Sequence, residues 1–138
     1  MSLFNIFNTT ANAMNAQNIR LNLVASNIAN ASTIAGSKED AYKALNPVFT
    51  QALQVARGNS TQYMGVSITD IVPSNAENNA IYQPENPMAD EAGYIYQSNV
   101  NPIDEMANMI SASRSYQTSV EVLNTSKDLM MRTLRLGE

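Results

Sequence analysis

The sequence predicts a mainly α fold in which two long terminal helices pack as a coiled-coil-like pair. Apolar residues recur every seven positions near both ends of the 138-residue chain, and neither glycine nor proline interrupts the two patterns. Between them, β-branched residues give way to a stretch rich in proline and asparagine. This composition predicts a small β-hairpin followed by an extended irregular segment.

The N-terminal helix is expected over residues 3–29. Its apolar row consists of Phe7, Met14, Leu21 and Ile28. A seven-residue period stays on one face only if the helix winds around a partner, so this row is a predicted packing seam. The domain organisation that follows begins with an N-terminal helical segment over residues 1–31.

The opposite face of this helix carries a stripe of asparagines, for which two interpretations stay open. One is a solvated face, although exposed helices normally carry Lys and Glu, and Arg20 is the only charged residue among residues 1–37. We favour a polar interface stripe that is buried against other copies, with amides bonding between helices. Its members are Asn5, Asn8, Asn12, Asn15 and Asn22.

Residues 32–100 form the predicted middle segment, which begins with a hinge at Gly36. Strands are expected over residues 47–56 and 62–72, with a turn at residues 58–60. A single hairpin is only marginally stable, so it must lean on the helices or on a neighbour.

The extended segment is expected over residues 73–101. It contains prolines, asparagines and the tyrosines Tyr82, Tyr94 and Tyr96. We interpret these tyrosines as packing residues rather than as a stacking platform for bases.

The C-terminal helix, within residues 101–138, is expected to run from Asn101 to Leu136. Asn101 is a good N-cap, and Pro102 suits the first helical position. The predicted seam row consists of Met109, Tyr116, Leu123 and Met130, with Met106, Val120 and Leu134 in a second row beside it. The two seven-residue patterns make the terminal helices natural partners.

The composition excludes several classes of function. The chain has no Cys and no His, so it lacks thiolates, the usual zinc ligands and the commonest general base. We therefore expect no enzyme, with no catalytic, cofactor-binding or metal-binding residues and no cofactor. Adjacent carboxylates diverge on helices and strands, so we interpret these pairs as solvated charge: Glu39 and Asp40, Asp90 and Glu91, Asp104 and Glu105.

The charge and the hydropathy of the chain limit the kinds of partner that it can have. The formal net charge is −4 with no basic patch, so no nucleic-acid partner is expected. No apolar run approaches the roughly 18 residues of a spanning helix, so no membrane insertion is expected. The N-terminus lacks the basic and apolar regions of a cleaved secretory signal peptide.

Two blocks resemble the flagellar rod and hook proteins. Residues 21–30 are similar to the N-terminal signature of that whole family, with Ser26, Asn27, Ala29 and Asn30 among the matching residues. A second block is similar to the short proteins of the proximal rod, although Ser98 replaces a usual proline. The matching segments are residues 86–90, 93–94, 99–101, 105–106, 111–117 and 120–125. The matching residues include Asn86 and Pro87 in the first segment, and Arg114 and Tyr116 in the fifth.

The resemblance implies a structural subunit of the flagellar basal-body rod, located in the periplasm and exported without a cleaved signal peptide. It implies a helical hetero-polymer with further copies and other rod proteins, which transmits torque and conducts exported subunits. The implied partners also include the adaptor between the rod base and the MS ring, and the flagellar type III export apparatus. The terminal helices would form the inner core of the rod, with the middle segment outside them.

Two alternatives stay open. One is a different short rod subunit of the same family, against which the block at residues 111–116 argues. The other, from a different class, is a helical adaptor or export chaperone. Such a protein would form a stable small oligomer, whereas a rod subunit would be secreted and, when purified, would be monomeric or would aggregate.

Overall fold

The computed structural model describes residues 3–55 and 62–135. The prediction of two long terminal helices with a β-hairpin between them is confirmed, whereas the predicted turn at residues 58–60 and the end of the C-terminal helix at residue 136 lie outside the described residues. The elements are α1 (Leu3–Ala29), β1 (Ile34–Ala35), β2 (Leu45–Val55), β3 (Gln62–Pro73), β4 (Asn79–Tyr82), β5 (Tyr94–Gln97) and α2 (Pro102–Arg135).

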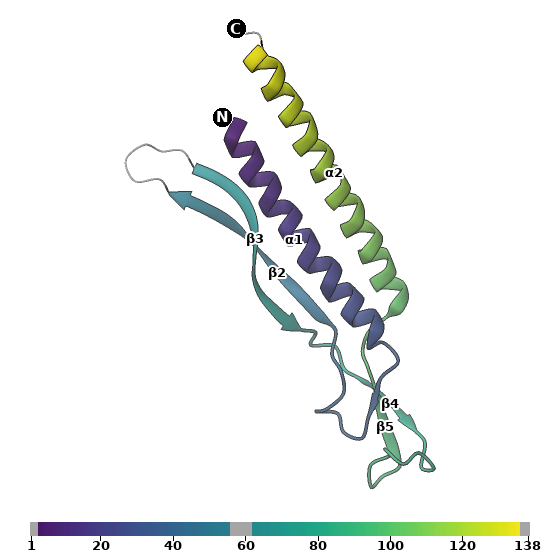
Figure 1. Cartoon of the computed structure of the whole chain (residues 1–138). Helices are drawn as coiled ribbons and strands as arrows, with labels where there is room; N and C mark the ends of the chain where they lie inside the picture. The colour runs from purple at the N-terminus through teal and green to yellow at the C-terminus, as the bar shows by residue number, and fades with distance from the viewer. Residues whose placement is uncertain (1–2, 56–61, 136–138) are drawn as a thin grey trace.

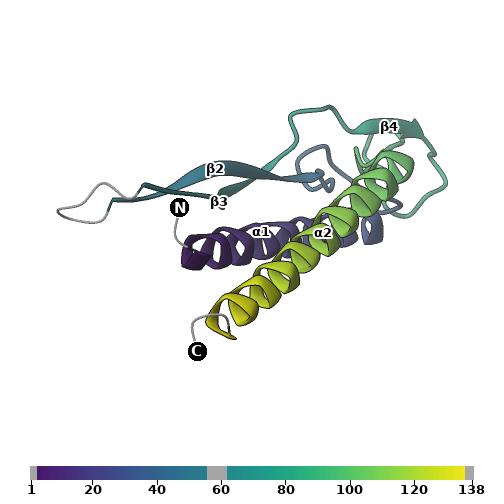
Figure 2. The ribbon, with the colours of Figure 1, turned by 90° about the horizontal axis from the view of Figure 1, so that it is seen from above.

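Helix α1 lies between two partners. The hairpin β2–β3 runs along one side of it, and α2 runs antiparallel along the other (Figures 1 and 2). Helix α1 contacts α2, β2 and β3, whereas α2 packs only against α1 among the described elements. The hairpin therefore leans on a helix, as its marginal stability requires.

The start of α2 has the cap that the sequence predicts. The Asn101 side-chain Oδ1 accepts a hydrogen bond from the backbone N–H of Ile103 at 3.1 Å, and its Nδ2 donates to Asp104 Oδ2 at 2.8 Å. Pro102 is the first helical residue. These bonds satisfy a donor that would otherwise be orphaned at the helix N-terminus.

The prediction of an irregular segment over residues 73–101 was wrong in part. Strands β4 and β5 lie within it and form an antiparallel sheet with β1, in the order β1-β5-β4. Gln97 of β5 is opposite both Ile34 of β1 and Asn79 of β4. Ile95 at the centre of the sheet is buried. Strands of two and four residues are too short for an alternating pattern to reveal them.

At two positions near this sheet, other atoms come so close to the backbone that only glycine fits. A Cβ at Gly36 would lie 2.8 Å from the Met88 carbonyl oxygen, and one at Gly93 would lie 2.9 Å from the Tyr82 ring. Gly93 also has a φ of +82°, which other residues rarely adopt. Gly36, the expected hinge, is therefore a position where the backbone passes close to the β4–β5 loop.

The core of the described chain consists mainly of small side chains. Large apolar residues, in contrast, are exposed on α2, on the hairpin and on the small sheet. Few large side chains are available to hold a single copy together. The buried apolar residues are Ala16, Leu23, Val24, Ala31, Ala35, Ala41, Ile95, Val100 and Ala112.

Candidate functional site

A buried asparagine joins three elements at the base of the helix pair. Asn27, near the end of α1, is only 1% exposed. Its Nδ2 donates to the Leu45 carbonyl at 3.0 Å and to Glu105 Oε2 at 3.0 Å. Its Oδ1 accepts from the Leu45 N–H at 2.9 Å and from the Tyr42 hydroxyl at 3.0 Å. We call these four residues, Asn27, Tyr42, Leu45 and Glu105, the Asn27 junction.

Glu105 extends this junction across the helix pair. Its Oε1 accepts from Asn108 Nδ2 at 3.2 Å, and Asn108 Oδ1 accepts from Arg20 Nη2 of α1 at 3.2 Å. Glu105 is buried, so the interpretation of the pair with Asp104 as solvated charge was wrong for this residue. Burying a carboxylate is costly unless hydrogen bonds compensate it, and here Asn27 of α1 and Asn108 of α2 each donate one.

The other residues of the N-terminal motif surround this junction. The hydroxyls of Ser26 and Tyr42 lie 3.4 Å apart. Asn30 Nδ2 donates to the Ser26 carbonyl at 2.8 Å and so caps the last turn of α1, whereas Ala29 is exposed. Most of the motif thus serves the junction where the helices meet the middle segment.

The C-terminal motif residues are more widely spread. Asn86 Oδ1 accepts from the Met88 N–H at 3.0 Å, and Pro87 beside it is exposed. Arg114 is exposed on α2, and Tyr116 is half-buried. Asn86 and Pro87 belong to the β4–β5 loop, so the structure does not bring them together with the Asn27 junction.

Ser98, which stands where the family usually has proline, makes hydrogen bonds at the entry to α2. Its backbone N–H donates to the Thr33 carbonyl at 3.1 Å, and its Oγ accepts from the Val100 N–H at 3.3 Å. Proline has no N–H and could not make the first bond. Ser98 therefore ties the chain that enters α2 to the chain that leaves α1.

Asp90 organises the β4–β5 loop. Its Oδ1 accepts from the N–H groups of Tyr94 at 2.8 Å and Ala92 at 2.9 Å, and its Oδ2 accepts from the Tyr96 hydroxyl at 3.2 Å. The Tyr94 bond is the main cause that lowers the pKa of Asp90. Tyr82 and Tyr94 pack edge to face at 5.3 Å, which supports the interpretation of the tyrosines as packing residues.

The predicted seam residues are all half-buried in the single chain. The buried positions of α2 form a neighbouring row of small and polar residues, Glu105, Ala112 and Ser126. The single chain therefore leaves part of each predicted seam side chain uncovered. The half-buried seam residues are Phe7, Met14, Leu21 and Ile28 on α1, and Met109, Tyr116, Leu123 and Met130 on α2.

Beyond the seam, α2 exposes further large apolar side chains on the side that α1 does not cover. Ile103 is 77% exposed and Leu134 is 64% exposed. We call the exposed residues of this face, which continues the second predicted row, the outer apolar face: Ile103, Met106, Ile110, Met131 and Leu134.

The asparagine stripe of α1 is divided in the structure. Asn5 is buried, whereas Asn8, Asn12, Asn15 and Asn22 are exposed in the single chain. Their burial against other copies stays a prediction.

The described residues contain no group of His, Cys, Asp and Glu that could hold a metal ion. Over the same residues, neither helix combines the length and hydropathy needed to cross a bilayer.

Comparison with known proteins identifies the family. Residues 7–34 match the family model for flagella basal body rod proteins, and residues 91–136 match the C-terminal model of the flagellar basal body rod FlgEFG proteins. The flagellar basal-body rod protein FlgC of Yersinia enterocolitica is 46% identical over the full length of both chains. FlgC of Escherichia coli O157:H7 is 45% identical, and FlgC of Buchnera aphidicola subsp. Acyrthosiphon pisum is 43% identical, again over both full lengths. The chain therefore belongs to the FlgC family of flagellar basal-body rod proteins.

Proposed function

We propose that the chain is a structural, non-enzymatic subunit that polymerises helically within the flagellar basal-body rod. The outer apolar face of α2 is the observation that carries this proposal. Large exposed apolar surfaces on folded chains mark sites of protein association. Since α2 has only α1 as a partner among the described elements, its uncovered face is available to neighbouring subunits.

The hairpin, which lies on the other side of α1, also exposes apolar side chains and so supports the same proposal. Its strands expose Val48, Phe49, Val66, Ile71 and Val72. A subunit with uncovered apolar side chains on two separate sides can contact more than one neighbour. Contacts of this kind, repeated without closing, produce a helical polymer.

The mechanical role follows from such packing. Residues 1–31 and 101–138 would form the inner core of the rod, and residues 32–100 would lie outside it. Twisting the polymer would require many interlocked helix seams to slip at the same time. The subunit would thus transmit torque passively, around a channel that conducts exported subunits.

Membership of the family supports the proposed partners. They would be other copies of this chain and other rod proteins in one hetero-polymer, the adaptor between the rod base and the MS ring, and the type III export apparatus. The chain would reach the periplasmic part of the basal body through that apparatus, without a cleaved signal peptide. The exposed asparagines of α1 would form uncharged lateral contacts within the polymer.

Complementation tests the proposed function. The chain is expressed in flagellated cells that lack their own FlgC, and basal bodies are purified from them. We expect swimming in soft agar, with the chain present in the purified rods. A chain that stays in the cytosol as a stable small oligomer, in cells that do not swim, would instead support the adaptor or chaperone alternative.

A matched pair of variants tests the observation behind the proposal. Ile110→Asp places a carboxylate on the outer apolar face, where burial against a neighbour would leave it unpaired. Thr118→Asp makes the same addition at an exposed polar position of the same helix. We expect loss of swimming for the first variant only, and equal swimming of both variants would contradict the assignment of this face.

A further inference from the structure

Charged residues are unevenly distributed along the sequence. From Gly58 to Ser113 the sequence contains carboxylates but no Lys or Arg. Two of these carboxylates, Glu85 and Glu91, are exposed in the loop between β4 and β5. This loop lies at one end of the molecule, and the last turn of α2 lies at the opposite end (Figure 1).

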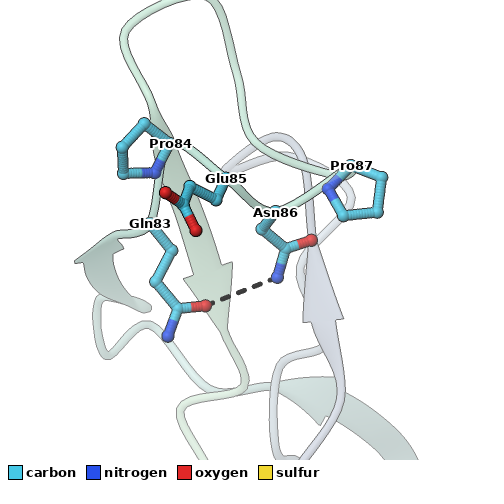
Figure 3. Close-up of a pocket in the computed structure, with 5 residues that line it drawn as sticks. All are labelled: Gln83, Pro84, Glu85, Asn86 and Pro87. Atoms are coloured by element: carbon cyan, nitrogen blue, oxygen red, sulfur yellow. Dashed lines mark hydrogen bonds between the residues drawn. The ribbon is translucent and has the colours of Figure 1, made fainter.

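The acidic end contains a hollow. It is open, has a volume of about 560 Å³ and is lined by residues 83–87. Figure 3 shows the Glu85 side chain between those of Pro84 and Asn86, with the Asn86 amide bonded to Gln83. The hollow is flanked along the chain by Tyr82, which is 63% exposed, and by the exposed Met88. The hollow therefore contains one carboxylate, that of Glu85, and exposed apolar side chains lie next to it in the sequence. Lys38 also lies close enough to β5 for its charge to act on Tyr96, and it pairs with Glu77 at 2.9 Å.

The opposite end has the complementary chemistry. Met131, Arg132, Leu134 and Arg135 in the last described turn of α2 are all exposed. Arginine presents an apolar stem and a guanidinium that bonds carboxylates in a two-pronged geometry. Within the described residues, neither of these arginines nor Glu85 or Glu91 forms an ion pair. Glu138 follows in the sequence, outside the described residues.

We propose that the last turn of α2 in one copy docks on the β4–β5 loop of a second copy. Arg132 and Arg135 would pair with Glu85 and Glu91, while Met131 and Leu134 would pack against the exposed Tyr82 and Met88. The two surfaces lie at opposite ends of one chain, so the contact is head to tail and leaves a free surface at each end of a chain of copies. The proposal rests on the proposed function, because it supplies one of the contacts of the polymer.

The charges assign a distinct role to this contact. Charge complementarity mainly determines which surfaces meet and how fast, whereas apolar contacts supply most of the affinity. The acidic loop repels another acidic loop, and the basic turn repels another basic turn. Copies are thereby directed to join with the same polarity.

Two reciprocal charge-reversal variants of the full chain test the proposal. The head variant is R132E/R135E and the tail variant is E85R/E91R, all at exposed positions. Each variant alone presents like charges at both ends, so each should require about a tenfold higher concentration than the wild type to self-associate. An equimolar mixture restores opposite charges at every junction and should associate as the wild type does. Sedimentation velocity at low salt measures this, with circular dichroism to verify folding.

Single variants outside both surfaces serve as controls. Glu121→Arg and Lys43→Glu make the same kinds of charge change at exposed positions and should associate as the wild type does. The proposal is overturned if the wild type stays monomeric, if either reversed variant associates like the wild type, or if the mixture associates no better than its components. Each of these results leaves the complementation test of rod function unaffected, so the two proposals fail separately.

Discussion

At the scale of single residues, Asn27 determines where three elements meet. A side-chain amide offers both a donor and an acceptor, so Asn27 can bond the N–H and the carbonyl of Leu45, as a neighbouring strand would. Its remaining capacity is used by Tyr42 and Glu105. An apolar residue of similar size would leave these buried groups without partners.

Replacement of Asn27 tests this role. Asn27→Ala removes four hydrogen bonds from a buried site, and we expect a loss of about 3 kcal/mol in the free energy of unfolding. Asn22→Ala is the control, because Asn22 is exposed and, among the residues that the structure describes, its side chain bonds only Asn18 of the same helix. Urea unfolding followed by far-ultraviolet circular dichroism measures both variants, and an equal loss in the two would refute the junction.

Asp90 gives a second prediction at this scale. Its lowered pKa means that the ionised carboxylate stabilises the folded loop, mainly through the Tyr94 N–H. This stabilisation is complete above the ordinary aspartate pKa of about 3.9 and is lost as the pH falls through the lowered value. We expect the Tyr94 amide resonance to titrate below that ordinary value, and not at all in Asp90→Asn. A midpoint above it in the wild type would contradict the assigned bonds.

The sequence could identify Asn27 only as part of a family motif. It wrongly predicted that the Glu105 carboxylate is solvated. Asp104 and Glu105 both suit the first turn of a helix, where negative charge is favourable. Nothing local distinguishes the exposed carboxylate from the buried one. That distinction depends on α1, which places Asn27 against Glu105 from a distant part of the chain.

At the scale of the elements, α2 has more apolar surface than α1 can cover. The row directly against α1 contains small and polar residues such as Ala112 and Ser126, which allow the helices to approach closely. The larger seam side chains lie beside this row and are half-buried. We therefore expect α2 to be covered from two directions in the assembled rod.

A substitution in the seam tests this arrangement. Leu123→Asp places a carboxylate at a half-buried seam position, and its burial by a neighbour should cost several kcal/mol for each interface. We expect soft-agar swimming and rod assembly to be lost. Asn124→Asp adds the same charge at the adjacent exposed position and should retain both. Normal rods in the Leu123→Asp strain would count against the seam.

The sequence predicted the long elements well and the short ones poorly. Helix α1 spans the predicted residues 3–29, and the hairpin strands differ from their predicted bounds by at most two residues at their described ends. Those elements have periodic patterns or local caps. Strands β1, β4 and β5 do not, because their pairing joins residues as distant as Ile34 and Gln97. Neither the sheet nor its acidic hollow could be derived from local patterns.

At the scale of the whole molecule, the chain is long and thinly packed. Helix α2 has 34 residues and is therefore about 50 Å long. It is supported by one helix, over a core of small side chains. We expect a fold of this kind to gain much of its apolar burial from association, and we propose that its two chemically different ends give that association a direction.

The most direct test of this account is a structure of basal bodies that contain this chain, at side-chain resolution. The account predicts that neighbouring subunits cover Ile103, Met106, Ile110 and Leu134, all of which are exposed in the single chain. The same structure would show whether the seam rows are fully buried. An assembled rod in which the outer apolar face still points to solvent would contradict the central claim that neighbours complete this fold.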